Sequence, residues 1–349
     1  MSLKDQGHKT DANHLKILMA RYSEVQLATL VDAPPQGDGW LHEIKLDGYR
    51  LLAYVSEGAA RLFTRNGKDW TNSFPSLSAA LETLPVKSAV LDMEAVMLDE
   101  TGKSSFQALQ AALGEGGDRA RIVAYVFDLL HIDGEDLARQ PLIERKTRLQ
   151  TILRSKKLPL RYSGHVLGQG AEMLAKACEA GLEGIISKEA RAPYRSGRQR
   201  SWLKIKCSRR QEFIIVGFSD ARKGERALGA LYLAYKQHGT LRYAGKVGTG
   251  FSMQSARMLA SRFSEIGVKT PILSRGETVG VGAGEWRAVH WVKPVLLCEV
   301  TFTEWTNDGR IRHPSFEGLR EDKDASQVKK EEIMQTSTHT KSAPHKEKK

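Results

Sequence analysis

Cysteine is scarce in this sequence, and long apolar runs are missing. The 349 residues include three cysteines, Cys178, Cys207 and Cys298, which lie far apart and form no CxxC pair. This spacing excludes a cysteine zinc site and predicts small, mostly buried thiols in a reduced, cytosolic protein. No stretch approaches the roughly 18 apolar residues of a membrane span. The polar start MSLKDQGHKTDANH predicts no signal peptide.

The glycine-rich signatures of common nucleotide-binding folds are also missing. The sequence contains no GxxxxGK[ST] motif, so phosphates are not expected to be held by a P-loop. Gly245, Gly248 and Gly250 in GKVGTG follow a strand-like segment without the context of a dinucleotide-binding fold. A hairpin turn is therefore the better interpretation of these glycines.

Positive charge exceeds negative charge, and the excess is unevenly distributed. The formal net charge is +12 and the isoelectric point is about 9.5. Between Lys188 and Arg210, nine residues are Lys or Arg and one is acidic, Glu189. Pro193 and Gly197 interrupt this segment, which indicates a basic loop rather than a helix face. A polyanionic partner such as nucleic acid is the favoured interpretation, and a solvated basic surface is the alternative.

Apolar alternation predicts an α+β domain over residues 25–209. The composition, 41% apolar and 27% charged, is that of a soluble globular protein, and the length allows two domains. Strand patterns rich in β-branched and aromatic residues dominate this region, which favours antiparallel sheets. Helical patterns interrupt the strands over residues 73–84, 104–113, 143–153 and 171–180.

The pattern changes after residue 209. Residues 210–325 contain about five short strands and one helix over 252–263, which is typical of a small closed barrel such as an OB-fold. The predicted fold class is therefore an α+β domain followed by an OB-fold β-barrel. Residues 1–24 are expected to be flexible, and the basic tail 326–349 is expected to be disordered.

The segment Glu43–Arg50, EIKLDGYR, carries the most specific chemical pattern. Lys45 lies in a strand-like stretch, Asp47 alternates onto the same face, and Gly48 permits a tight turn. The amine, the carboxylate and the Arg50 guanidinium would then surround a space for phosphate. A lysine is a nucleophile only as the free amine, and its ordinary pKa near 10.4 leaves about one in 2,500 neutral at pH 7. We therefore expect nearby cations or burial to lower the pKa of Lys45.

Suitable cations occur elsewhere in the sequence. SWLKIK places Lys204 and Lys206 on one face of a strand, where they would face either a phosphate or, at a sheet edge, solvent. Arg65, in RLFTRNG, precedes an Asn-Gly turn and would either bind phosphate or cap the turn.

Carboxylates and an aromatic ring complete the pattern. Glu94 lies in the apolar strand VLDMEAVML, where a carboxylate is costly unless it is paired or metal-bound. Glu183 stands between two glycines, before a strand that ends in Lys188. The two carboxylates would hold a hard divalent cation with substrate phosphates, or form ordinary salt bridges. Phe127 in YVFDLL is by itself best explained as a core residue, with base stacking as the alternative. Together these parts indicate nucleotidyl transfer.

These elements resemble the motifs of the covalent nucleotidyltransferases, which include DNA ligases, RNA ligases and mRNA capping enzymes. KLDGYR at 45–50 is similar to motif I, and RxDK at 320–323 resembles the ligase form of motif VI. Between them, in the family's order, lie matches to motifs Ia, III, IV and V: RNG at 65–67, FDLL at 127–130, EGIISK at 183–188 and WLKIK at 202–206.

Longer segments resemble the ATP-dependent ligase domain of bacterial end-joining ligase D. They are LHEIKLDGYR, LGALYLAY, YAGKVGTGF and RHPSFEGLREDK. That protein usually carries polymerase and phosphoesterase modules, and neither is visible in this sequence. The chain departs from the family in one place, because Met93 replaces the usual glycine before Glu94.

The resemblance implies how these residues act. Lys45 would attack the α-phosphate of ATP and become a lysyl-adenylate, while Lys204 and Lys206 neutralise that phosphate. AMP would pass to the 5′-phosphate of DNA, and a 3′-hydroxyl would displace it to seal the strand. The implied catalytic set also includes Asp47 and Arg50, and the implied ligands of Mg²⁺ or Mn²⁺ are Glu94 and Glu183. The implied nucleotide-binding residues are Glu43, Arg65, Phe127, Lys188, Arg320, Asp322 and Lys323.

The resemblance further implies a monomeric, cytoplasmic enzyme of a bacterial nucleoid that acts on nicked or broken double-stranded DNA in repair or end joining. A Ku-like end-binding protein is the implied partner. The alternatives are an RNA ligase, a capping-type nucleotidyltransferase, and a catalytically silent OB-fold module that binds nucleic acid.

Overall fold

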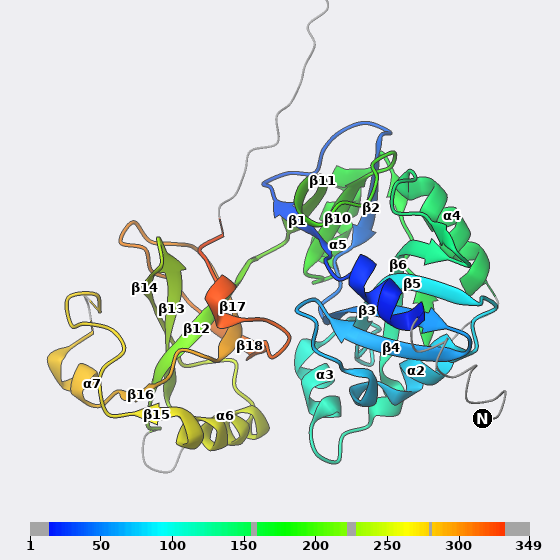
Figure 1. Ribbon diagram of the computed structural model, residues 1–349. Coiled ribbons are helices and arrows are strands. Elements are labelled where there is room, and N and C mark those ends of the chain that lie inside the picture. Colours follow the sequence, from blue (N-terminus) through cyan, green and yellow to red (C-terminus); the bar gives the residue numbers. More distant parts are fainter. Residues whose placement is uncertain (1–13, 155–158, 222–227, 279–280, 332–349) are drawn as a thin grey trace, which may run out of the picture.

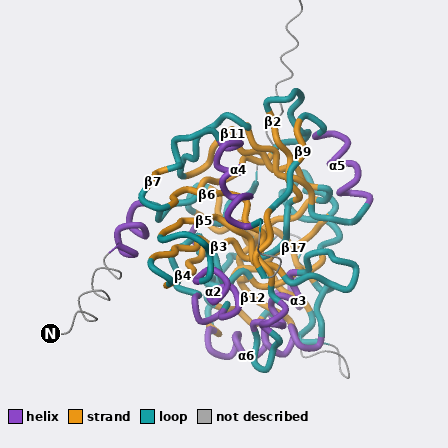
Figure 2. The backbone as a smooth tube through the Cα atoms, turned by 90° about the vertical axis from the view of Figure 1, so that its right-hand side faces the viewer, coloured by secondary structure: helices purple, strands orange, loops and turns teal. Residues whose placement is uncertain are grey.

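A computed structural model describes residues 14–154, 159–221, 228–278 and 281–331 (Figure 1). These residues form two parts that join between residues 206 and 209. The N-terminal part contains two sheets and the C-terminal part contains one. In the view turned by 90°, helices lie around the outside of the strands (Figure 2). The expected flexible residues 1–13 and tail residues 332–349 lie outside the described residues.

A six-stranded sheet forms the larger layer of the N-terminal part. Its order is β4-β3-β5-β6-β7, with β8 beside β6, and every pair is antiparallel except β6–β8. Leucines of three helices share one core with this sheet, because each helix is apolar along one face. The strands are β3 Tyr49–Ser56, β4 Ala59–Thr64, β5 Ser88–Val96, β6 Val123–Ile132, β7 Glu135–Asp136 and β8 Leu160–Tyr162, and the helices are α2 Pro75–Glu82, α3 Phe106–Leu113 and α4 Leu142–Leu153.

A five-stranded sheet forms the second layer, in the order β1-β11-β10-β2-β9. Its register aligns Glu43, Ile186 and Lys204 across three neighbouring strands. The basic segment that was expected to be a loop enters β11 at Gly197, because it pairs there with β1. The elements are β1 Gln26–Leu30, β2 Trp40–Ile44, β9 Val166–Leu167, β10 Gly184–Glu189, β11 Gly197–Lys206 and α5 Gly170–Glu179.

The C-terminal part is built on the long strand β12, which pairs with β13, β16 and β17. The sheet runs β14-β13-β12-β16-β15, and β17 also carries β18. The elements are β12 Arg209–Ser219, β13 Ala230–Gln237, β14 Thr240–Val247, α6 Met253–Ile266, β15 Gly267–Val268, α7 Ala283–Arg287, β16 His290–Val292, β17 Leu297–Phe302 and β18 Ser315–Leu319.

The prediction of a closed barrel is wrong. Within the described residues, no strand ladder joins β14 to β18, so the sheet stays open at this edge. Two single backbone hydrogen bonds span that gap instead. The N–H of Ile311 donates to the carbonyl of Ala244, and the N–H of Phe316 donates to that of Thr249, each at 2.9 Å. The segment between β17 and β18 therefore approaches β14 without becoming a strand of the sheet.

Both ends of the described chain are more ordered than the sequence predicted. Residues 14–21 are helical, and Leu18 and Tyr22 are buried against the six-stranded sheet. At the other end, Val328 is buried in the C-terminal part and its carbonyl accepts from the N–H of Lys236 at 3.0 Å. Sparse apolar residues at suitable positions are enough to anchor these segments.

The cysteine prediction is wrong for two of the three residues. Cys178 in α5 and Cys207 after β11 form a disulfide, while Cys298 is a buried free thiol. The two lie 29 residues apart in sequence, so spacing gave no signal of the pairing.

The five helices expected from periodicity are confirmed within a few residues by α2, α3, α4, α5 and α6. Of the residues that the structure covers, none belongs to a helix both long and apolar enough for a membrane span.

Candidate active site

Lys45 follows β2 directly and begins the turn into β3. Its backbone N–H donates to the carbonyl of Gly184 at 2.9 Å, which ties the turn to β10. Lys45 and Asp47 therefore lie in a loop, not on one face of a strand as predicted. Gly48 is required here, because a Cβ at this position would come within 2.1 Å of the Ala95 carbonyl oxygen.

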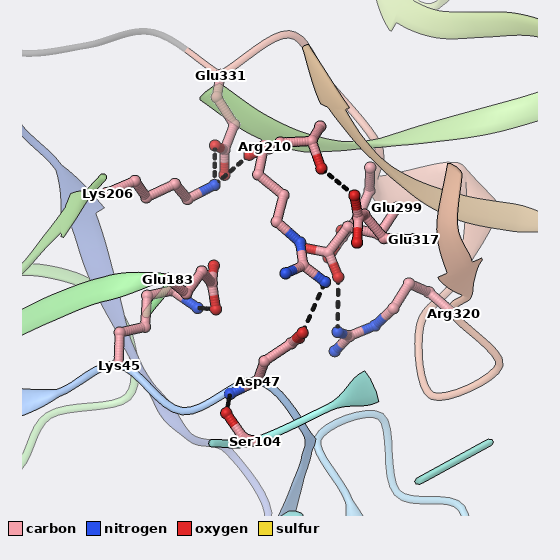
Figure 3. A network of polar contacts seen from close by, with 12 residues as sticks. Lys45, Asp47, Ser104, Glu183, Lys206, Arg210, Glu299, Glu317, Arg320 and Glu331 are labelled. Carbon is pink, nitrogen blue, oxygen red and sulfur yellow. Dashed lines mark hydrogen bonds and ion pairs between the residues drawn. The ribbon is translucent and has the colours of Figure 1, made fainter. Parts of the chain in front are cut away.

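The ammonium group of Lys45 binds a carboxylate. Its Nζ donates to Oε2 of Glu183 at 2.6 Å (Figure 3). Burial alone would lower the pKa of Lys45, but Glu183, Glu299 and Glu94 outweigh burial and raise this pKa above its ordinary value. The expectation of a lowered pKa is therefore wrong for this structure. Lys45 can lose its proton and become a free amine only when Glu183 no longer pairs with it.

Lys204 and Lys206 lie two residues apart on β11 and bind the same carboxylate, that of Glu331. Lys204 donates to Oε1. Lys206 donates to Oε2 at 2.9 Å and to the carbonyl of Arg210 (Figure 3). Burial and Lys206 lower the pKa of Lys204 to about 8, against the opposing effect of Glu331. Two half-buried ammonium groups that converge on one carboxylate form an anion site.

A pocket of about 160 Å³ opens beside Lys45. Glu43, Phe127, Lys188 and Trp202 are among its lining residues. The half-buried Phe127 ring lies edge-on to Trp202, with 6.0 Å between ring centroids. Aromatic walls beside a buried carboxylate suit a flat base with a polar edge.

Three donors converge on the carboxylate of Glu43. We call the end of the pocket formed by Glu43 and Lys188 the base end, because it suits the polar edge of a nucleobase. Lys146 in α4 donates to Oε1 at 2.5 Å, and Lys188 in β10 donates to Oε2 at 3.0 Å. The hydroxyl of Ser163 also donates to Oε2, at 3.2 Å. Burial alone would raise the pKa of Glu43, but Lys146 and Lys188 outweigh burial and hold this pKa below its ordinary value.

Arg50 supports the wall of the pocket. Its guanidinium donates to both carboxylate oxygens of Asp92, at 2.9 and 2.6 Å, and to the carbonyl of Gln26 at 2.7 Å. Its central carbon lies 5.3 Å from the centroid of the Phe127 ring. The structure thus uses the Arg50 donors to join β3, β5 and β1 at the edge of the pocket.

Glu94 and Glu183 have the chemistry of ligands for a hard cation. Oε1 of Glu183 is buried and has no hydrogen-bond partner within the described part of the chain. Burial raises the pKa of Glu94 to about 7, with Lys45 opposing. Across residues 14–331, gaps excepted, no three His, Cys, Asp or Glu residues gather for a metal. Mg²⁺ bound by one or two carboxylates and substrate phosphates needs no such cluster, so the two residues fit it.

A chain of ion pairs joins the two parts of the molecule (Figure 3). Asp47 lies 2.8 Å from Arg210, Arg210 lies 3.0 Å from Glu299, and Glu299 accepts from Arg320 at 3.1 Å. Arg320 also donates to both oxygens of Asp322 at 3.0 Å. Burial and Glu299 raise the pKa of Asp47 to about 7, with Arg210 opposing. The predicted site residues Asp47 and Arg320 are therefore linked through two residues.

Arg65 and Lys323 share this positive neighbourhood. Burial lowers the pKa of Lys323 far below its ordinary value, and Arg65, Lys204 and Lys45 lower it further. The ammonium group of Lys323 binds the carboxylate of Glu212, a residue of β12. Burial also lowers the pKa of Arg65. Arg65 and Lys323 thus lie near Lys45 and Lys204 where the two parts meet, while Glu43, Phe127 and Lys188 line the pocket within the N-terminal part.

Sequence reasoning missed five residues of this region: Asp92, Lys146, Arg210, Glu299 and Glu331. Asp92 carried the same signal as Glu94, a carboxylate inside an apolar strand. Lys146 interrupts the apolar face of α4, which was a readable anomaly. Arg210 was counted only as part of the basic segment, and Glu331 lies in a stretch expected to be disordered.

Comparison with known proteins places these observations in a family. Residues 19–206 match the family described as "ATP dependent DNA ligase domain", and residues 224–323 match "ATP dependent DNA ligase C terminal region". The chain is 43% identical over 318 residues to the multifunctional non-homologous end joining protein LigD of Pseudomonas aeruginosa, covering 90% of this chain and 37% of that protein.

Two further relatives agree. The LigD protein of Mycobacterium tuberculosis is 35% identical over 295 residues, covering 84% of this chain and 37% of its own length. The solved structure of a mycobacterial DNA ligase D complexed with ATP and MES has a TM-score of 0.64 at 33% identity, covering 86% of this chain and 97% of that one. The chain thus spans about 37% of the length of these curated relatives.

Proposed function

This chain belongs to the family of ATP-dependent DNA ligases, and from this we propose that it seals breaks in double-stranded DNA that carry a 3′-hydroxyl and a 5′-phosphate. The observation that carries the proposal is the position of Lys45, whose ammonium group lies beside a base-sized aromatic pocket and faces an acidic residue, Glu183. We take residues 25–209 as the adenylation domain and residues 210–325 as an OB-type domain.

In the first step the Lys45 amine attacks the α-phosphorus of ATP. A P–N bond forms, the P–O bond to pyrophosphate breaks, and the enzyme becomes a lysyl-adenylate. Lys204 and Lys206 neutralise the α-phosphate, in the position that the Glu331 carboxylate takes in this structure. Arg320, Asp322 and Lys323 orient the departing pyrophosphate, and Asp47 couples Lys45 to them through Arg210.

The base of ATP lies between the aromatic walls of the pocket. Phe127 supplies the stacking surface, Glu43 and Lys188 supply polar contacts, and Arg50 holds the wall in place. Arg65 contacts the nucleotide or the 5′-phosphate of the break. Glu94 and Glu183 would hold Mg²⁺ or Mn²⁺, which supplies positive charge to the phosphates.

In the later steps AMP passes to the 5′-phosphate of DNA, and the 3′-hydroxyl displaces it. The C-terminal part must first leave Lys45 to make room for DNA, a gated movement of the kind known for lids and domains. This movement breaks the ion pair of Asp47 with Arg210 and the pairs of Lys204 and Lys206 with Glu331, which join the two parts.

The basic segment of β11 gives DNA a binding surface, and the family resemblance supports a role in repair or end joining. We place the protein in the bacterial cytoplasm, at the nucleoid, as a monomer recruited by a Ku-like end-binding protein.

The test is label transfer to the full chain from α-³²P-labelled ATP, GTP or NAD⁺, read on a denaturing gel. We expect acid-labile label from ATP that nicked DNA discharges. In Lys45→Ala the label should vanish while DNA binding stays, because the basic segment is unchanged. Label from GTP alone would indicate a capping enzyme, discharge only by RNA would indicate an RNA ligase, and no label at all would leave a silent binding module.

A further inference from the structure

The base end of the pocket holds a lysine, Lys146, that the proposed steps do not use. Lys146 is fully buried, and its Nζ donates to the carbonyl of Ser163 at 2.9 Å as well as to Glu43. Its Nζ also lies 4.7 Å from the centroid of the Tyr162 ring. A buried ammonium group is costly unless it is paired, and its placement is fixed here by three groups from two separate segments, Glu43 in β2 and the neighbours Tyr162 and Ser163.

Glu43 has a limited number of acceptor sites. An ionised carboxylate offers about four lone-pair positions, and Lys146, Lys188 and Ser163 fill three of them. Because Glu43 lines the pocket, the remaining position is available to a bound base. An ionised carboxylate accepts hydrogen bonds and cannot donate one.

We propose that Lys146 is a positioning residue that sets nucleobase selectivity, by holding Glu43 as an acceptor-only carboxylate that binds an exocyclic amino group and repels a carbonyl. This inference rests on the proposed function. Adenine carries an amino group at position 6, where guanine carries an acceptor oxygen. The carboxylate therefore favours ATP over GTP only while it stays ionised.

The second lysine is what keeps it ionised. Burial lowers the pKa of Lys188, and Glu43 opposes that effect. If Lys188 were the sole partner, this buried pair could become neutral by passing a proton from the lysine to the carboxylate, which removes two desolvated charges. The protonated carboxyl would then donate a hydrogen bond to a carbonyl oxygen. With Lys146 present, two ammonium groups face one carboxylate and the proton stays off Glu43.

The experiment compares first-turnover labelling of the full chain by α-labelled ATP and GTP at subsaturating concentration. The readout is the ATP:GTP ratio of labelling rates, which does not depend on the fraction of folded enzyme. Lys146→Gln keeps two hydrogen-bonding positions but removes the charge, and Lys146→Met removes both. We expect each to lower the ratio by roughly tenfold or more, as expected for losing a hydrogen bond to a charged group.

Two controls make the result specific. Arg148→Met, in the same helix α4 but exposed and paired with Glu135, should leave the ratio unchanged. In a Glu43→Gln background, Lys146→Gln should have no further effect on the ratio, because Lys146 acts through Glu43.

The outcomes are distinct. A ratio unchanged in Lys146→Gln, with both rates reduced equally, would overturn the inference and make Lys146 a structural residue. A ratio that falls in Lys146→Met but not in Lys146→Gln would also overturn it, since packing and not charge would then be responsible. Failure of the proposed function looks different, because the unaltered chain would take no label from ATP.

Discussion

The two ends of the nucleotide pocket are built on different plans. At the base end, Glu43, Lys146 and Lys188 all come from the N-terminal part and are nearly fully buried. At the phosphate end, Asp47, Lys204 and Lys206 find their partners in residues from Arg210 onward. The first end is complete by itself, whereas the second is complete only while the two parts are together. Selectivity thus rests on fixed contacts, and chemistry rests on contacts that can be exchanged.

The largest expected effect comes from breaking a buried ion pair of the N-terminal part, next in α4 to Lys146 of the fixed end. The guanidinium of Arg145 binds both oxygens of Asp128 at 2.7 and 2.8 Å, and both side chains are fully buried. Arg145→Met leaves an unpaired buried carboxylate, so we expect the free energy of unfolding to fall by about 3–5 kcal/mol. Denaturant titration measures this change. Arg148→Met removes an exposed pair of the same helix and should cost below about 1 kcal/mol, and equal losses would contradict the contrast.

The next effect tests the exchangeable end. Arg320 links Glu299 and Asp322 behind Asp47 in this closed arrangement. We expect Arg320→Gln to slow enzyme adenylation by roughly 100–1,000-fold, the usual loss for one preorganised donor to a developing charge. Sealing of pre-adenylated DNA should slow much less. Single-turnover assays of the two steps measure this difference, and equal losses would argue against a pyrophosphate role.

A third effect concerns pH. Burial raises the pKa of both Glu94 and Asp47 to about 7. If the ionised form of one of them is required, its titration should raise the adenylation rate roughly tenfold from pH 6 to pH 8, and roughly 100-fold if both are required. For stability the sign is opposite, because raised pKa values give stabilisation below about pH 4 that is lost as the pH rises through 7.

The pH profile also separates these carboxyls from the nucleophile. Because the pKa of Lys45 is raised above its ordinary value, its titration lies above this range, so the profile should bend near pH 7. If the bend persists unchanged in Glu94→Gln, the titration near pH 7 belongs to Asp47 and not to Glu94.

The smallest effect concerns the counter-ion of the lysine pair. Glu331 binds Lys204 and Lys206, so a nucleotide phosphate competes with it for that position. Glu331→Gln should therefore lower the KM for ATP in adenylation several-fold, on the scale of one partly exposed ion pair, with kcat little changed. Glu304→Gln, which removes the exposed pair with Arg312, is the matched control. A raised KM would instead make Glu331 a support for the lysines.

The same contrast explains what could be predicted from sequence. Lys45, Phe127, Glu183 and Lys188 belong to short local patterns, and the structure brings them together at one pocket. The five helices were readable because each has apolar residues at helical spacing. Local pattern was therefore sufficient wherever a residue's role depends on its own strand or turn.

The rest depends on contacts between distant segments. The raised pKa of Lys45 comes from Glu183, which is 138 residues away, and Arg210 binds a carboxylate of each part. The open edge between β14 and β18 depends on how one connecting segment packs, which strand patterns do not report. The Cys178–Cys207 pair likewise follows from the packing of α5 against β10, the strand beside β11. Predicting such features requires knowing which distant segments lie side by side in the folded protein.

The segment that carries Glu331 also provides an optical signal. The neighbouring Lys330 places its ammonium 4.4 Å from the centroid of Trp305, an indole packed edge-on against Tyr235 and Phe302. A phosphate that displaces Glu331 would carry Lys330 away from this ring. The fluorescence of Trp305, isolated by replacing other tryptophans, would then register each arrival and departure of nucleotide without an added dye.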